Sequence, residues 1–355
     1  MLIRHRDTVV LLLGFVSLLF LAATLILARR PLEIREKMLG ASKRMEEAIR
    51  EIRRCRERKE IGIDEDTDIN RTGLIGLETS LITTSLGSLE AKRTTANPNF
   101  AGLVCLLLYQ AGVRRGDPVA IGASSSFPAL IIAALSAAEA MELPGLLICS
   151  LGASQWGANH PDFNWLDILA CLDQTHLFSS RLVALSLGGE GDVGSDMSPE
   201  GRDLLLRRGL KTGLRFIVEA DLGKNVEERL RIFEQEAGGS GIRAFVNIGG
   251  SYASMGTDSE VLRVGPGLAS FTEIPPAERR GLIFAMAARG IPVIHLLYVK
   301  GLCDRYGLPW DPSPLPSPGQ GRIFQMREVN PLSLVVLAAA YFVLLAAILA
   351  INARS

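Results

Sequence analysis

The chain has 355 residues, and its 38 basic and 38 acidic side chains leave no formal net charge. A neutral chain has no overall electrostatic attraction for nucleic acid. Aromatic residues make up only 6% of the chain, which argues against a stacking platform for single-stranded nucleic acid. We therefore expect no nucleic-acid partner, while the 48% of apolar residues is enough for a packed core.

The first long apolar segment covers residues 8–28, TVVLLLGFVSLLFLAATLILA, and contains no charged residue. At about 1.5 Å per residue, a helix of this length crosses a hydrocarbon layer of roughly 30 Å. The segment is longer than the apolar core of a usual signal peptide and has no clear cleavage site before Arg29. It therefore predicts a transmembrane helix within residues 1–30.

A second uncharged apolar segment, LSLVVLAAAYFVLLAAILAI, follows Pro331 and predicts another transmembrane helix within residues 331–355. Two spans place both termini on one face of the bilayer and the residues between them on the other. Arg4 and Arg6 precede the first span, whereas a larger basic group follows it, namely Arg29, Arg30, Arg35, Lys37, Lys43 and Arg44. By the positive-inside rule, we predict a two-pass protein of the cell membrane with its domain in the cytoplasm.

Residues 31–95 are predicted to form a juxtamembrane helix and a linker. Residues 32–59 are rich in Arg, Glu and Lys, with apolar residues near helical spacing, which predicts a solvated helix that is also able to self-pair. The acidic run at 63–68, IDEDTD, lacks the glycine and the distal glutamate of a calcium loop. It is predicted to be a solvated linker.

The five cysteines lie far apart in the sequence, at Cys55, Cys105, Cys149, Cys171 and Cys303. No two of them have the close spacing of a zinc knuckle or a redox motif. We expect buried free thiols in the apolar runs and, from the odd count, a reducing compartment. No metal site and no cofactor are predicted, and no Walker A motif is present in the sequence.

Residues 96–310 alternate short apolar runs with helical patterns. Strands are predicted at 118–123, 145–150, 182–187, 215–218, 243–248 and 292–297. Helices are predicted at 98–111, 128–141, 165–172, after a cap at Ser198, at 226–236 and at 276–289. This order predicts an α/β domain with a doubly wound, mostly parallel sheet and helices on both faces, flanked by the two transmembrane helices. Residues 311–330 are predicted to be a proline-rich linker.

The turn after the first of these strands contains three consecutive serines, Ser124, Ser125 and Ser126. Ligands of doubly wound sheets bind at the carboxyl ends of the strands, and hydroxyl groups before a helix N-terminus can bind a carboxylate or a phosphate. One alternative is simple helix capping by Ser126. Another is a nucleophilic serine with His160 or His295 as its base, although the turn lacks the glycine of a nucleophile elbow.

Polar residues also follow the other strands. The further candidates for ligand binding are Ser154, Asn159, His160, Asp162, Asn247, Ser251 and His295. His160 and Asp162 are close enough in sequence to be a metal-binding or proton-transfer pair, but we favour polarity of a surface loop as the explanation. No residue is assigned a catalytic role.

Residues 189–194 match the pattern G-x-G-x-x-G. The next helix starts only at Ser198, and Glu190 and Asp192 would repel a pyrophosphate. We therefore expect a polar turn here, or a carboxylate pair that holds a cation, rather than a dinucleotide site.

Five segments together resemble the bacterial poly-gamma-glutamate system proteins, and the resemblance runs from about residue 83 to residue 299. The segments are LGSLEAKRTTANPNFA, GDPVAIGASSSFPAL, LLICSLGASQWGANHPDFNWLDI, GGEGDVGSDMSPEGRDLL and AFVNIGGSYASMG. The resemblance implies an accessory membrane protein of poly-γ-glutamate synthesis or export, for capsule or secreted polymer. It implies contact with the synthase and export components or with the anionic polymer, but it carries over no catalytic residues. Lys92, Arg93 and Lys300 would add positive charge for the carboxylates of such a ligand.

Two other functions remain open at this point. One is a membrane-tethered serine-type hydrolase or transferase that acts on an amide or acyl bond at the turn of Ser124, Ser125 and Ser126. The other is a scaffold that dimerises through the helix at residues 32–59.

Overall fold

The computed structural model describes residues 5–354. It consists of two compact units, which are described separately below. One unit is formed by the residues up to Arg35 and from Gln325 onward, and the other by Glu36–Phe324.

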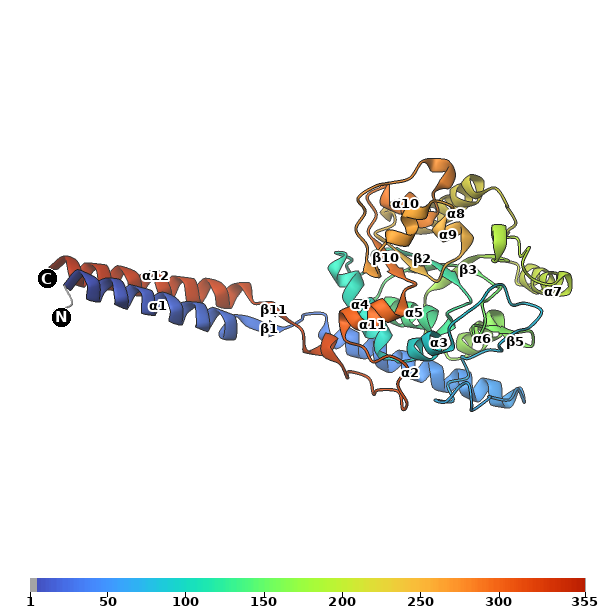
Figure 1. The fold of residues 1–355 in the computed structure, drawn as a ribbon, viewed down its shortest axis with the longest axis horizontal. Coiled ribbons are helices and arrows are strands. Elements are labelled where there is room, and N and C mark those ends of the chain that lie inside the picture. The colour runs from blue at the N-terminus through green and yellow to red at the C-terminus, as the bar shows by residue number, and fades with distance from the viewer. Residues whose placement is uncertain (1–4, 355) are drawn as a thin grey trace. The chain divides into compact units, whose positions relative to one another are not determined.

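The first unit is an antiparallel pair of long helices, α1 (His5–Leu27) and α12 (Pro331–Arg354), which lie side by side (Figure 1). A short ladder of β1 (Arg29–Pro31) and β11 (Arg327–Val329) joins them at one end. The Tyr341 ring stacks on Phe20 with 4.4 Å between the centroids. Within the described residues, these are the two helices long and apolar enough to cross a membrane. Both predicted spans are thus confirmed as helices of sufficient length.

The second unit is built around a seven-stranded sheet with the order β7-β6-β3-β2-β8-β10-β9. All neighbouring strands are parallel except β9, which pairs antiparallel with β10 at one edge. The strands are β2 (Val119–Ser124), β3 (Gly145–Ser150), β6 (Arg181–Ser186), β7 (Arg215–Ile217), β8 (Ala244–Ile248), β9 (Gly267–Leu268) and β10 (Val293–Leu296). The predicted α/β class with a mostly parallel sheet is confirmed, and the antiparallel edge strand was not predicted.

Ten α-helices in the described part of this region surround the sheet or connect its strands. They are α2 (Arg35–Arg58), α3 (Leu89–Thr95), α4 (Asn99–Gln110), α5 (Pro128–Met141), α6 (Trp165–Asp173), α7 (Pro199–Leu210), α8 (Leu222–Ala237), α9 (Tyr252–Met255), α10 (Leu282–Ala287) and α11 (Val299–Tyr306). Alternate residues of β3 face opposite sides: Leu146 and Ile148 pack with α8 in one apolar cluster. Gly145 approaches Ala138 of α5 on the other side. Both faces of the sheet are therefore covered, which explains the continuous apolar strands.

Local signals in the sequence account for several helix boundaries. Pro128 occupies the first turn of α5, where a missing N–H costs nothing. The Ser198 hydroxyl caps α7 by accepting from the Gly201 N–H, as the sequence predicts. The predicted helix at 276–289 is instead a 3-10 turn followed by α10, because Gly281 is extended and breaks the run.

The prediction of a solvated helix at 32–59 is wrong for one face of α2. Met38, Met45 and Ile52 have no exposed surface, and these apolar positions at helical spacing pack against the α/β domain. Charged pairs such as Arg50 with Glu46 occupy the solvent-facing side. The structure places this helix within the same unit as the sheet.

One pair of cysteines differs from the expectation of buried free thiols. Cys55 of α2 forms a disulfide with Cys171 of α6, with 6.1 Å between the Cα atoms. The two residues are 116 positions apart, so their pairing leaves no signature in local sequence spacing. Cys105, Cys149 and Cys303 are free and buried.

Both segments predicted as linkers fold against the domain. In the acidic run, Asp68 is buried and its carboxylate accepts from the N–H groups of Thr72 and Gly73. In the proline-rich segment, Asp311 forms an ion pair with Arg93 of α3. These segments are ordered by tertiary contacts that the local composition does not reveal.

Candidate functional site

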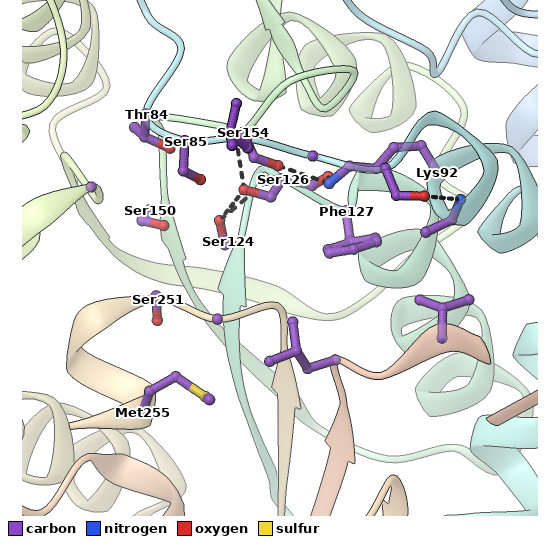
Figure 2. Close-up of a pocket in the computed structure, with 18 of the residues that line it drawn as sticks. Thr84, Ser85, Lys92, Ser124, Ser126, Phe127, Ser150, Ser154, Ser251 and Met255 are labelled. Carbon is purple, nitrogen blue, oxygen red and sulfur yellow. Dashed lines mark hydrogen bonds between the residues drawn. The ribbon is translucent and has the colours of Figure 1, made fainter. Parts of the chain in front are cut away.

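A cavity of about 710 Å³ opens at the carboxyl ends of the parallel strands (Figure 2). Its walls come from the loops that follow β2, β3, β6, β8 and β10, together with residues 84–92. The chain winds outward from β2 through β3 and β6 to β7, and then returns to place β8 on the other side of β2. The cavity therefore lies at the point where the strand order reverses, which is the usual ligand site of such sheets.

Lys92 is the buried cation of this cavity. Its side chain is 3% exposed, and its Nζ atom contacts the Ser126 carbonyl oxygen at 2.5 Å and Ser154 Oγ at 2.9 Å. The same atom lies 3.5 Å from the centroid of the Phe127 ring. No carboxylate of the described chain forms an ion pair with Lys92. Burial lowers the pKa of Lys92 to about 7, because nothing offsets the loss of water around the charged amine.

A chain of hydrogen bonds joins the serines around this amine (Figure 2). The Ser124 hydroxyl donates to Ser126 Oγ at 2.9 Å. Ser126 Oγ in turn accepts from the Ser154 N–H at 2.9 Å. The loops after β2 and β3 are thereby fixed to one another, and Ser154 is held beside Lys92.

Four of the predicted site residues line this cavity, namely Ser124, Ser126, Ser154 and Ser251. Ser125 is buried beneath them and donates to the Ser150 carbonyl oxygen at 2.6 Å. The capping alternative for Ser126 is wrong, because the N-cap residue of α5 is Phe127 and no side chain caps this helix.

Asn159, His160 and Asp162 lie outside the cavity, on the hairpin of β4 (Asn159–His160) and β5 (Phe163–Asn164). The Asn159 side chain accepts from the Leu77 N–H at 2.8 Å and so anchors the segment before α3. His160 Nδ1 accepts from the Asp162 N–H at 3.1 Å. This arrangement is a local turn, in which the imidazole is bonded to the backbone of Asp162 and not to its carboxylate.

Asn247 and His295 also lie outside the cavity, on adjacent strands β8 and β10. The Asn247 amide lies 3.0 Å from His295 Nδ1. Burial lowers the pKa of His295 to about 4, so this imidazole is neutral near pH 7. No hydrogen bond joins His160 or His295 to the three-serine turn in the described structure. The serine–histidine alternative therefore lacks its base.

The acidic residues of the glycine-rich loop after β6 lie in two different environments, one inside the protein and one at the cavity wall. Asp192 is buried and accepts hydrogen bonds from Ser186 Oγ at 2.8 Å and from Arg229 at 2.5 Å. It is an internal anchor and does not hold a free cation. Glu190 and Asp196 line the cavity. Within residues 5–354, no group of three or more His, Cys, Asp or Glu side chains is arranged to hold a metal ion.

Two features of the site were missed from the sequence. The first is the burial of Lys92, which was expected only as a source of positive charge. The second is Ser150, which ends β3 and lines the cavity at 2% exposure; its hydroxyl has no hydrogen-bond partner in the described chain. A serine at the carboxyl end of a parallel strand was the available signal for the second.

No protein family, no curated protein and no solved structure matches this chain.

Proposed function

We propose that this protein is a membrane-anchored enzyme that hydrolyses or transfers an amide or acyl bond, with Ser154 as nucleophile and Lys92 as general base. The observation that carries the proposal is the 2.9 Å contact between Lys92 Nζ and Ser154 Oγ inside the cavity. Serine–lysine pairs are one of the recurring arrangements for acyl transfer. A nucleophile–base contact of this length also satisfies the first geometric requirement for proton abstraction.

The surroundings of Lys92 suit the neutral amine that a base requires. A neutral amine has two N–H groups and one lone pair. In the structure, Lys92 Nζ donates to Ser154 Oγ. Once the amine is neutral, the Ser126 carbonyl oxygen and the face of the Phe127 ring can accept its two N–H groups, which leaves the lone pair for the Ser154 hydroxyl. In the reaction, Ser154 Oγ attacks the carbonyl carbon while its proton passes to Lys92 Nζ. The C–N bond of an amide then breaks, and Lys92 returns that proton to the leaving amine.

Water completes hydrolysis by the same route. It attacks the ester carbonyl carbon of the acyl-enzyme and gives a proton to Lys92 Nζ. The bond between the carbonyl carbon and Ser154 Oγ then breaks, and Ser154 Oγ regains the proton. The net reaction converts an amide and water into a carboxylic acid and an amine.

The resemblance to poly-gamma-glutamate system proteins supports a role for this chemistry in the synthesis or export of that polymer. Each of the five resembling segments contributes residues to the cavity wall. The backbone of poly-γ-glutamate consists of amide bonds, and its pendant carboxylates would meet the cavity hydroxyls and Lys300. The synthase and export components are the partners that this role implies.

A second candidate is a protein that binds the anionic polymer without altering it. The serine hydroxyl groups at the cavity favour it, and so does the Lys92 amine, which forms no ion pair within the described chain. Both kinds of group are donors for a carboxylate. Binding of a carboxylate beside Lys92 would keep the amine protonated. Under this candidate, Lys92 is not a base.

We further propose that the two helices cross the membrane and that the α/β domain lies outside the cytoplasm. The basic residues after the first span predict the cytoplasmic side, but long domains are translocated largely regardless of such charges. The disulfide between Cys55 and Cys171 favours an oxidising compartment. Reporter fusions at the two termini test this topology: reporters active only in the cytoplasm are expected to work at both ends, and activity only outside would reverse the assignment.

The enzyme proposal is tested with the full-length protein in detergent micelles and a fluorophosphonate probe. We expect covalent labelling of the Ser154 peptide, detected by mass spectrometry, and its loss in Ser154→Ala. Ser251→Ala is the matched control, because Ser251 lines the same cavity but makes no hydrogen bond to Lys92. An unlabelled protein that still binds poly-γ-glutamate would decide for the second candidate. Release of new amine groups from the polymer would identify it as the substrate.

A further inference from the structure

The cavity has a second group of polar side chains beside the proposed nucleophile. Glu190 and Asp196 come from the loop after β6 and line the wall. No ion pair or hydrogen bond joins either carboxylate to another side chain of the described protein. Ser150 lines the same cavity, and its buried hydroxyl also lacks a partner.

Two glycines place the loop after β6 directly against Ser150 and Asp196. A Cβ atom at Gly188 would lie 2.9 Å from Ser150 Oγ, and one at Gly189 would lie 2.9 Å from the carboxyl carbon of Asp196. Both glycines have positive φ, at 76° and 70°, which other residues rarely adopt. The loop backbone therefore lies against both Ser150 and Asp196, and only glycine fits at this approach.

This group is also near the proposed nucleophile. Ser150 is the parallel-strand partner of Ser124 in the sheet register. Ser124 binds Ser126, which accepts from the N–H of Ser154. Because β6 is two strands away from β2, the carboxylates lie roughly 10 Å along the sheet from the three-serine turn. One end of the cavity thus offers Lys92, and the other offers two carboxylates and a free hydroxyl.

We infer that Ser150, Glu190 and Asp196 form a subsite for a primary amine, which resolves the acyl-enzyme in place of water. The inference rests on the proposed acyl-transfer function and deepens it by naming the acceptor. Carboxylates attract an ammonium group, and a hydroxyl oxygen accepts one of its hydrogen bonds. The protein is then a transferase that exchanges one amide for another, a reaction that needs no nucleoside triphosphate.

In the transfer step, the acceptor nitrogen loses two protons. The bound ammonium loses one proton to a carboxylate of the subsite, which later releases it to water. The neutral amine is no longer held by the carboxylates and moves along the cavity to Ser154. Its nitrogen attacks the ester carbonyl carbon there, and a C–N bond forms. The second proton passes from that nitrogen to Lys92 Nζ and then to Ser154 Oγ as the C–Oγ bond breaks. The products are a new amide and the free serine.

The test measures how the acyl-enzyme divides between water and an amine. Full-length protein in detergent micelles is given the γ-p-nitroanilide of glutamate as acyl donor and glycylglycine as acceptor. Released nitroaniline reports acylation, and mass spectrometry gives the ratio of transfer product to free glutamate. We expect Glu190→Gln combined with Asp196→Asn to lower this ratio about tenfold, and Ser150→Ala to lower it by a smaller factor.

The ratio compares two fates of the same acyl-enzyme, so it reports the choice of acceptor whatever the acylation rate of each variant. Glu200→Gln, on the exposed first turn of α7, is the matched control for the charge change. An unchanged ratio in the double variant overturns the amine subsite while the acyl-transfer function stands. The absence of any nitroaniline release or probe labelling overturns the proposed function and this inference together.

Discussion

Lys92 and Arg229 are two buried basic residues of the α/β unit with opposite surroundings. Arg229 is 3% exposed and pairs with the Asp192 carboxylate at 2.5 Å; its guanidinium also binds Asn225 and Ser186. Lys92 is equally buried but has only a carbonyl oxygen, a hydroxyl and an aromatic face. Arg229 therefore forms an ion pair that fixes the loop after β6, whereas Lys92 has a proton to lose near neutral pH.

Arg229 has a structural role as an ion, whereas the surroundings of Lys92 suit proton transfer. A buried charge without a counter-charge is costly, and a fold tolerates it when the group titrates to its neutral form. The next residue along α3 makes the same point, since Arg93 reaches the Asp311 carboxylate and is stabilised as a cation. On this view, the ion pairs of the domain can be exchanged for apolar packing with effects on stability alone, and Lys92 cannot be exchanged without loss of activity.

The largest expected effect is that of Lys92→Met on the reaction. Loss of the general base should slow the labelling of Ser154 by the fluorophosphonate probe about 10⁴-fold. The thermal midpoint, followed by tryptophan fluorescence in detergent, should stay the same or rise, because methionine fills the site without an unpaired amine. Lys300→Met is the control for loss of one positive charge at the cavity. If Lys92→Met is less stable but its folded fraction is labelled at the rate of the unmodified protein, Lys92 is not the general base.

The matched substitution Arg229→Met should reverse this pattern. It leaves the Asp192 carboxylate buried and uncompensated, so the free energy of unfolding should fall by about 4 kcal/mol, as measured by denaturant titration. The labelling rate of the folded fraction should change little. The double variant Asp192→Leu with Arg229→Met should recover most of the lost stability. If it does not, the ion pair of Asp192 and Arg229 stabilises the fold by more than mutual neutralisation of the two charges.

Removal of the disulfide should have a somewhat smaller effect, of about 3 kcal/mol. The bond ties α2 to α6 across 116 residues, so Cys55→Ser with Cys171→Ser frees a long loop in the unfolded chain. The double variant avoids leaving a single reactive thiol, and Cys303→Ser is a control at a free cysteine. The thermal midpoint of the unmodified protein should fall to that of the double variant after reduction. Equal stability with and without reductant would show that the bond is not formed in the purified protein.

Local patterns in the sequence predicted the helix α5, the strand β3 and the cap at Ser198, because a few neighbouring residues determine each of them. For the site, the sequence predicted which loops carry it but not which side chains meet there. Lys92 is 34 residues from Ser126 and 62 from Ser154, and only the packing of α3 over the strand ends brings them together. His160 and His295 were predicted as possible bases because of the usual pKa of histidine. His295 lies within the sheet and His160 on a hairpin, so neither lines the cavity.

The pH dependence tests the protonation state of Lys92 with an effect of about tenfold per pH unit. Burial lowers the pKa of Lys92 from 10.5 to about 7, so the second-order labelling rate of Ser154 should rise tenfold per unit below pH 7 and level off above it. The sign for stability follows from the same shift: between pH 7 and 10.5 the unfolded chain binds the proton that the native amine has released. The free energy of unfolding should therefore rise with pH across this window, and Lys92→Met should lack that increment. Lys92→Arg, which stays charged, should be inactive at every pH. A flat rate profile from pH 5 to 9 would show that Lys92 keeps its proton and belongs with Arg229 among the structural cations.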